Sequence, residues 1–314
     1  MSKISVIGAG NVGATIANDL MIQGIASEIV LIDVNKKKAI GEALDVYQGA
    51  PFCSPAIVRP GEYEDAAGSD IVVITCGMAR KPGMSRLDLA QTNVDILKSV
   101  AESVVPYAKD AVYVIVSNPV DVLTYVFTKV SGVPENRIIG SGTILDTSRL
   151  QSELAKRFYI SPKNVHAHVY GEHGDSSFVP WSLVHIANNH VDDYKESSPD
   201  KNRIHWNQDY EEVEQFVKKS GAKIIENKGA TFYAVAMSVC HICKCVFSDA
   251  GTALTVSSMM HGEYGVDDVC LSTLALVDRT GIRGKIINKM TDQEIEKLHI
   301  SANKLKSVIE QIKI

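Results

Sequence analysis

The feature that most restricts the fold is a glycine-rich run near the start of the chain, GAGNVG at residues 8–13. It follows a short apolar segment, residues 4–7, and precedes a helical pattern over residues 14–21. A second apolar segment, residues 29–32, ends at Asp33, which lies 20 residues after the last glycine of the run. The glycine run alone is a weak signal. In this context of strand, helix, strand and acid, it predicts a dinucleotide-binding site.

Each part of this pattern has a physical role at a dinucleotide. Glycines let the chain turn sharply and approach a pyrophosphate, and a helix N-terminus supplies N–H donors and a positive dipole end. The Asp33 carboxylate is suited to accept hydrogen bonds from both ribose hydroxyls, and it would repel a 2′-phosphate. The sequence therefore favours NAD over NADP. The contacts expected here are Gly8, Gly10, Asn11, Val12, Gly13 and Asp33.

Further apolar, β-branched segments repeat this alternation of strand and helix. Residues 70–74 and 112–116 suit parallel strands buried on both faces, and residues 39–46 and 87–101 have helical spacing. We therefore predict an α/β Rossmann domain with a doubly wound parallel sheet over residues 1–145. Ligands of such sheets bind at the carboxyl ends of strands. Four more cofactor contacts are expected at these ends, Thr75, Gly77, Val116 and Asn118, although a turn role alone would also explain Asn118.

A polar, basic loop, residues 77–89, follows one of these strand ends. It has Pro82 and Gly83 at its middle and no apolar periodicity. Arg80 and Arg86 lie six residues apart in it. We expect a lid that brings two guanidinium groups to an anion-binding site, and the alternative is an ordinary solvated loop.

The candidate catalytic groups come from residues 146–175. Asp146 and Arg149 are three residues apart, one helical turn, so they share a face. His173 follows an alternating apolar run, residues 165–170, which predicts a strand that leads into the turn GEHGD. A lone histidine is more often structural. Here a carboxylate, a guanidinium and an imidazole are available to one reaction.

The second half, residues 146–314, is predicted to be a separate α+β domain for substrate and catalysis. A helical pattern extends over residues 210–247 and includes Thr231, with Asp209 or Asn207 as a candidate cap. From spacing alone, Thr231 is equally well explained as an ordinary helix residue.

The rest of this half predicts an antiparallel sheet and a final helix. Short β-rich runs lie around residues 253–260 and 272–277, separated by glycine turns. Thr291 and Glu294 have the spacing of a capping box and open an amphipathic helical pattern at the C-terminus.

The composition excludes several other classes of protein. Hydrophobic residues make up 45% and charged residues 22% of the 314 residues, and the formal charge of -5 gives no bias toward nucleic acid. No segment has 18 uninterrupted apolar residues and no signal peptide is evident, so we expect a cytoplasmic protein without membrane association. The six cysteines are expected to be free thiols. Cys240, Cys243 and Cys245 lack a second C-x-x-C group, so no metal site is expected.

Five motifs together carry a resemblance to a known family. In chain order they are GAGNVG, ARKPGMSR, SNPVD, LDTSR and GEHGD. Their order and mutual spacing resemble the L-lactate/L-malate dehydrogenase family over nearly the whole chain. The resemblance implies hydride transfer between NADH and a small 2-keto acid, and assembly into a homo-oligomer, a dimer or a tetramer.

The resemblance also implies a role for each site residue. His173 would be the general acid and base, and Asp146 would pair with its other ring nitrogen and raise its pKa. Arg149 would hold the substrate carboxylate through two parallel hydrogen bonds. Arg86 would polarise the carbonyl when the loop closes, and Asn118 would orient substrate and cofactor.

The substrate prediction rests on conflicting positions. Arg80 stands where malate enzymes of the family have arginine and lactate enzymes have glutamine. An arginine left unpaired in a closed site is costly with pyruvate, whereas oxaloacetate supplies a second carboxylate. The segments GEHGD, GTILDTSR and NPVDVLTY, and the substrate-contact candidate Thr231, resemble lactate enzymes instead. The sequence therefore favours oxaloacetate and malate, with pyruvate and lactate as the alternative.

Two other classes of protein remain as alternatives. NAD-dependent glycosidases have a similar first half but require a divalent metal, and the pairing of LDTSR with GEHGD argues against them. A non-catalytic NAD sensor would have little reason to keep the catalytic groups together. For self-assembly, the apolar faces of residues 40–46 and 147–154 are candidate contacts, although core packing explains them equally.

Overall fold

The first half of the chain alternates strands with helices. The computed structural model describes residues 2–78 and 85–314, with the side chain of Arg86 excepted. The elements of this half are β1 (Lys3–Ile7), α1 (Asn11–Ile22), β2 (Glu28–Ile32), α2 (Lys36–Gln48), β3 (Ile57–Gly61), β4 (Ile71–Ile74), α3 (Arg86–Val104), β5 (Val112–Ile115), α4 (Val120–Val130) and β6 (Ile138–Gly140). The predicted helices and strands of this half are all present.

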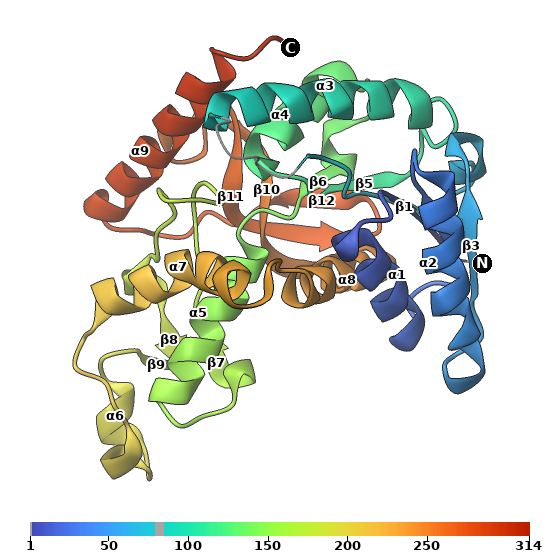
Figure 1. The fold of residues 1–314 in the computed structure, drawn as a ribbon. Helices are drawn as coiled ribbons and strands as arrows, with labels where there is room; N and C mark the ends of the chain where they lie inside the picture. The colour runs from blue at the N-terminus through green and yellow to red at the C-terminus, as the bar shows by residue number, and fades with distance from the viewer. Residues whose placement is uncertain (1, 79–84) are drawn as a thin grey trace.

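These six strands form a parallel sheet in the order β3-β2-β1-β4-β5-β6. Alternate strand residues enter different cores: Val72 and Ile74 pack with α3, α4 and α9, whereas Ile71 and Val73 pack with α1, α2 and α8. Helices therefore cover both faces of the sheet (Figure 1). Burial on both faces explains the continuous apolar strands, and the predicted doubly wound sheet is confirmed.

The second half adds antiparallel strands to the same sheet. Its elements are α5 (Ile144–Arg157), β7 (Val165–His166), β8 (His185–Ile186), β9 (Asn189–His190), α6 (Tyr194–Ser197), α7 (Tyr210–Lys228), α8 (Tyr233–Phe247), β10 (Thr252–His261), β11 (Asp267–Asp278), β12 (Gly281–Lys285) and α9 (Asp292–Ile309). Ser257 of β10 pairs with Gly140 of β6, so β10, β11 and β12 extend the parallel sheet to nine strands. The predicted antiparallel sheet is confirmed.

The sequence prediction of a single long, capped helix in the second half was wrong in detail. The long helix predicted over residues 210–247 is interrupted at Gly229, which has φ +85 and ends α7 in the left-handed conformation. Thr231 consequently lies in the link between α7 and α8. Asp209 does not cap α7 with its side chain and instead accepts a hydrogen bond from Arg157.

The strand predicted over residues 165–170 is also shorter than expected. It is reduced to β7 and a single bridge from Tyr170 to Phe178. The chain is nevertheless held firmly beyond β7, because the N–H of Gly171 donates to the carbonyl of Ser272 on β11.

The C-terminal helix α9 has the predicted capping box. Thr291 accepts from the N–H of Glu294, and Glu294 accepts from the N–H of Thr291. Leu298, Ala302 and Leu305 pack on the core shared with α3 and α4. Among the described residues, no helix is long and apolar enough to cross a membrane. The cytoplasmic location stays a prediction.

Candidate functional site

The turn between β1 and α1 has the geometry that its glycines predict. Gly8 has φ +108, and a Cβ on Gly13 would lie 1.8 Å from the carbonyl oxygen of Gly8. A Cβ on Gly10 would meet nothing within 4 Å, so this residue faces open space. Gly10 also has no side chain to cap α1, which leaves the first-turn N–H groups available to an anion. The turn therefore fits a dinucleotide pyrophosphate.

The carboxylate of Asp33 is fixed at the end of β2. Its Oδ2 accepts the N–H of Ala9 at 2.6 Å, and its Oδ1 accepts the N–H of Asn35 at 2.8 Å. It lines a cavity of about 850 Å³ that also contains Lys38 and Tyr63. These contacts hold the acid in place for the ribose hydroxyls that the sequence assigned to it.

Two neighbouring cavities collect most of the predicted cofactor contacts. The cavity beside Asp33 and a second one of about 560 Å³ share Thr75, Gly77 and Met78. The predicted residues that line one or both are Gly8, Gly10, Val12, Asp33, Thr75, Gly77, Val116 and Asn118. Asn11 and Gly13 line neither of these two: Asn11 begins α1, and Gly13 is buried against Gly8.

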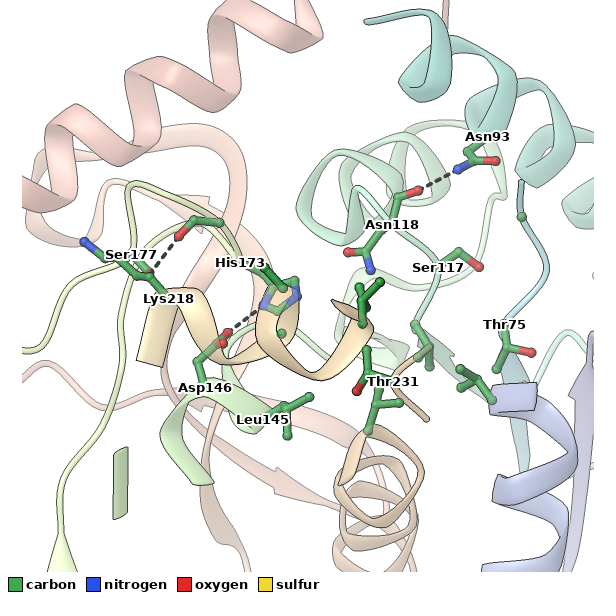
Figure 2. A pocket seen from close by; sticks show the side chains of 18 of the residues that line it. Thr75, Asn93, Ser117, Asn118, Leu145, Asp146, His173, Ser177, Lys218 and Thr231 are labelled. Carbon is green, nitrogen blue, oxygen red and sulfur yellow. Dashed lines mark hydrogen bonds and ion pairs between the residues drawn. The ribbon is translucent and has the colours of Figure 1, made fainter. Parts of the chain in front are cut away.

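A buried asparagine that the sequence analysis missed organises this edge of the sheet. Asn93 is 3% exposed, and its Nδ2 donates to the carbonyl of Asn118 at 2.7 Å (Figure 2). Its Oδ1 accepts the N–H of Met78 at 2.7 Å. The ends of β4 and β5 are thereby linked. The sequence does contain a signal for Asn93, because it is a polar residue on the apolar face of the helix predicted over residues 87–101.

The predicted catalytic groups meet in the 560 Å³ cavity. Nδ1 of His173 and Oδ2 of Asp146 lie 2.5 Å apart, and Nη1 of Arg149 donates to Oδ1 of Asp146 at 2.8 Å. One carboxylate on α5 therefore contacts both the imidazole and the guanidinium. With Nδ1 engaged, Nε2 of His173 is the nitrogen left for a ligand (Figure 2).

Electrostatics in the cavity favour the charged form of both partners. Burial alone would lower the pKa of His173, but the Asp146 carboxylate, with a smaller contribution from Asp121, raises it above its usual value. Burial acts on the pKa of Asp146 in the opposite sense, and the neighbouring His173 and Arg149 leave that pKa below its usual value. Both shifts favour an imidazolium beside an ionised carboxylate.

Other polar groups define the opposite walls of this cavity. Asn118 and Thr231 line it as predicted, and Ser177 and Lys218 line it without having been predicted. Lys218 on α7 lies 3.7 Å from the Glu214 carboxylate, so it is already paired. Figure 2 shows Asn118 and Thr231 on one side of His173 and Lys218 on the other.

The two arginines of the basic loop cannot be placed against this cavity. Arg80 lies outside the described residues, and the side chain of Arg86 is likewise not described. The backbone of Arg86 begins α3, which Ser85 and Asp88 cap reciprocally.

The chemistry of this edge of the sheet is now defined. A nicotinamide cofactor held by the β1–α1 turn would meet a substrate beside an imidazole that can exchange a proton and a guanidinium that can hold a carboxylate. A protein with this combination is an NAD-dependent 2-hydroxy acid dehydrogenase.

The chain belongs to the lactate/malate dehydrogenase family. Residues 2–140 match the NAD-binding domain of lactate/malate dehydrogenase, and residues 143–314 match the α/β C-terminal domain of the same family. The predicted family, its NAD cofactor and its two-part fold are thus confirmed. The boundary after residue 145 stays a prediction.

Curated relatives and solved structures agree with this family. The L-lactate dehydrogenase of Clostridium botulinum strain Hall is 47% identical over 98% of this chain and 96% of its own. That of Thermoanaerobacterium saccharolyticum is 44% identical over the full length of both chains. The minor L-lactate dehydrogenase of Enterococcus mundtii, solved with ligands, superimposes with a TM-score of 0.94, at 36% identity over 100% of this chain and 99% of that chain.

These comparisons bear on the alternatives left open by the sequence. The relatives are L-lactate dehydrogenases, which supports the pyruvate alternative better than the preference for oxaloacetate. The family assignment leaves the glycosidase and the non-catalytic sensor without support.

Proposed function

We propose that this enzyme interconverts pyruvate and L-lactate with NADH and NAD as the hydride donor and acceptor. The observation that carries the activity is the Asp146 carboxylate, bonded at once to His173 and to Arg149 inside a cavity next to the dinucleotide turn. The choice of pyruvate is supported by full-length relatives that are L-lactate dehydrogenases.

The cofactor site is assigned to the residues that line the two connected cavities. The first turn of α1 would bind the pyrophosphate, and Asp33 the ribose. Val116 and Asn118 would lie near the nicotinamide end, where they line the cavity that contains His173. Bound NADH would supply the hydride that reduces C2 of the keto acid.

His173 acts as the general acid in the reductive direction. It gives the Nε2 proton to the keto oxygen as C2 becomes a hydroxyl-bearing carbon, and it takes this proton back in the oxidative direction. Asp146 holds the ring through Nδ1 and stabilises the imidazolium form. The enzyme then needs no metal for proton transfer.

Arg149 binds the substrate carboxylate, while Asn118 and Thr231 shape the rest of the substrate site. The guanidinium is 14% exposed and already oriented by Asp146, so little side-chain entropy is lost when a carboxylate binds. Arg86 is assigned the role of polarising the carbonyl, on the family resemblance alone.

The described cations of the cavity suit a monocarboxylate. Arg149 and Lys218 are the lysine and arginine side chains among its described lining residues, and Lys218 is paired with Glu214. Arg149 contacts Asp146 through Nη1, and the other N–H groups of its guanidinium can hold one substrate carboxylate. Pyruvate has one, whereas oxaloacetate would need a second partner.

Oxaloacetate and L-malate are the second candidate pair, and Arg80 is the observation that favours them. The family's malate enzymes have arginine at this position, and an arginine that enters the closed site would pair with the second carboxylate. Against pyruvate, the same arginine would be left without a partner.

Steady-state NADH oxidation with pyruvate and with oxaloacetate, in wild type and in R80Q, decides between the two. A higher kcat/KM for pyruvate in the wild type, with little change in R80Q, supports lactate dehydrogenase. A wild-type preference for oxaloacetate that R80Q reverses would establish malate dehydrogenase instead. Turnover of neither keto acid would overturn the proposed function.

We also propose that the enzyme is a homo-oligomer, with α2 as a contact. Ile40 and Leu44 are 52% and 54% exposed on this helix, whereas Leu150 and Leu154 of the other predicted face are fully buried. Light scattering should give a mass above one chain, which L44E lowers. The control I300E changes an equally exposed isoleucine on α9 and should not lower it. A monomeric wild type would contradict the proposal.

A further inference from the structure

A second carboxylate lies behind the catalytic turn. Asp121, the second residue of α4, is 2% exposed, and its Oδ2 accepts the main-chain N–H of His173 at 2.7 Å. Asp121 comes from the half of the chain that binds the cofactor and is separated from His173 by 52 residues. Asp121 on α4 therefore contacts the main chain of His173, whereas Asp146 on α5 contacts its ring.

The environment of Asp121 is unusual for a carboxylate that only fixes a turn. Neither its Oδ1 nor the buried hydroxyl of Ser257 has a partner with full hydrogen-bond geometry among the described residues, although the Ser257 hydroxyl is near enough to lower the pKa of Asp121. Burial raises the pKa of Asp121 to about 6, against the smaller opposing effects of the Ser257 hydroxyl and the His173 main chain. A serine could anchor an N–H group at less cost, because a buried charge with an unpaired oxygen is expensive.

We propose that Asp121 is a positioning residue for the general acid: it fixes the main chain of His173 and places a second negative charge behind the imidazole. This inference rests on the proposed role of His173. The negative charge stabilises the imidazolium through space, so the acid form persists to higher pH than Asp146 alone would allow. Because Asp121 lies three residues after Asn118, the same short segment positions a cavity side chain and the catalytic turn.

The charged groups around the pair are consistent with this role. For His173, burial lowers the pKa, Asp146 raises it most, Asp121 raises it further, and Arg149 lowers it. Around Asp121, His173 lowers its pKa, whereas Glu172 on the same turn raises it. Burial raises the pKa of the Cys270 thiol on β11, and the Asp121 carboxylate raises it further.

The variant D121N removes the negative charge at residue 121 but can keep the hydrogen bond that anchors the main chain of His173. Its amide oxygen can still accept the N–H of His173, and its Nδ2 can donate to the Ser257 hydroxyl. The high-pH midpoint of kcat/KM for keto-acid reduction should move down by about half a pH unit or more. The low-pH midpoint for hydroxy-acid oxidation should move in the same direction, because both report the pKa of His173.

S301A is the matched control for the loss of a main-chain hydrogen bond in the catalytic turn. Ser301 on α9 accepts the N–H of Glu172 at 2.7 Å, so this variant removes a neutral acceptor from the adjacent amide. It should leave both midpoints in place, even if kcat falls. Unchanged midpoints in folded D121N, or an equal shift in S301A, would overturn the proposal.

If D121N does not fold, an NMR titration of the wild type, which needs no turnover, tests the same proposal. The His173 Cε1–H signal of the cofactor-free wild type should show, besides its own titration, a second inflection near the pH where Asp121 titrates. A single-step titration would contradict the proposal. Failure of this inference is distinct from failure of the proposed function: an active His173→Gln variant would refute the role of His173 itself.

Discussion

Asp146 contacts His173 and Arg149 through different oxygens of one carboxylate, with Nδ1 of His173 2.5 Å from Oδ2. Replacing it by asparagine leaves the burial that lowers the pKa of His173 and removes the larger of the two negative charges that raise it, those of Asp146 and Asp121. Reduction requires the protonated ring, which exists below this pKa. In D146N the reductive rate should therefore fall away at lower pH than in the wild type.

The size of the loss in D146N should reflect the loss of acid catalysis. At pH 7.5 we expect kcat for keto-acid reduction to fall by about 10²- to 10⁴-fold. The dissociation constant of NADH, measured by fluorescence, serves as the control and should change little, because Asp146 lies in the substrate part of the cavity. A wild-type pH profile in D146N would contradict this account.

Arg149 and Arg157 lie on the same helix and offer a matched comparison. Lysine at position 149 cannot form two parallel hydrogen bonds, so kcat/KM for the keto acid should fall by about 10²-fold or more. Arg157 is equally buried, at 14% exposure, but pairs with Glu153, Asp209 and Glu212. R157K should lower the unfolding temperature and leave kcat/KM nearly unchanged. Equal catalytic losses in both variants would argue against substrate binding by Arg149.

Local sequence rules predicted the parts of the site that short-range geometry determines. The helical spacing of Asp146 and Arg149 brought their side chains together, and the glycine spacing produced the turn at Gly8 and Gly13. Buried strands such as β4 were recognised by their continuous apolar character.

Other features depended on contacts between distant segments, which periodicity does not encode. Asn93 lies within a regular helix, and its structural role is to link the segments that follow β4 and β5. Asp121 meets His173 only because α4 and the catalytic turn pack together. The interruption of the predicted long helix at Gly229 was missed because helices tolerate isolated glycines, and only the backbone conformation shows that this one ends α7.

The preference for NAD over NADP can be tested at Asp33. D33N removes the charge that opposes a 2′-phosphate and keeps one oxygen acceptor, which can serve the N–H of Ala9 or that of Asn35 but not both. The ratio of kcat/KM with NADPH to that with NADH should rise tenfold or more, which corresponds to about 1.4 kcal/mol. D45N, at an exposed aspartate on α2, makes the same charge change and should leave the ratio unchanged. Equal ratios in D33N and the wild type would refute the assignment of Asp33.

Substitutions at Gly13 and Gly10 test two properties of the turn separately: its stability and its binding of the cofactor. A Cβ on Gly13 would lie 1.8 Å from the carbonyl oxygen of Gly8, so G13A should lower the free energy of unfolding by about 1–3 kcal/mol or more in urea titrations. A Cβ on Gly10 would meet open space, and its extended conformation suits alanine. G10A should therefore keep wild-type stability, whereas its NADH dissociation constant should rise about tenfold, because the methyl group would occupy the approach to the pyrophosphate. If G10A bound NADH as tightly as the wild type, the pyrophosphate could not lie against this turn.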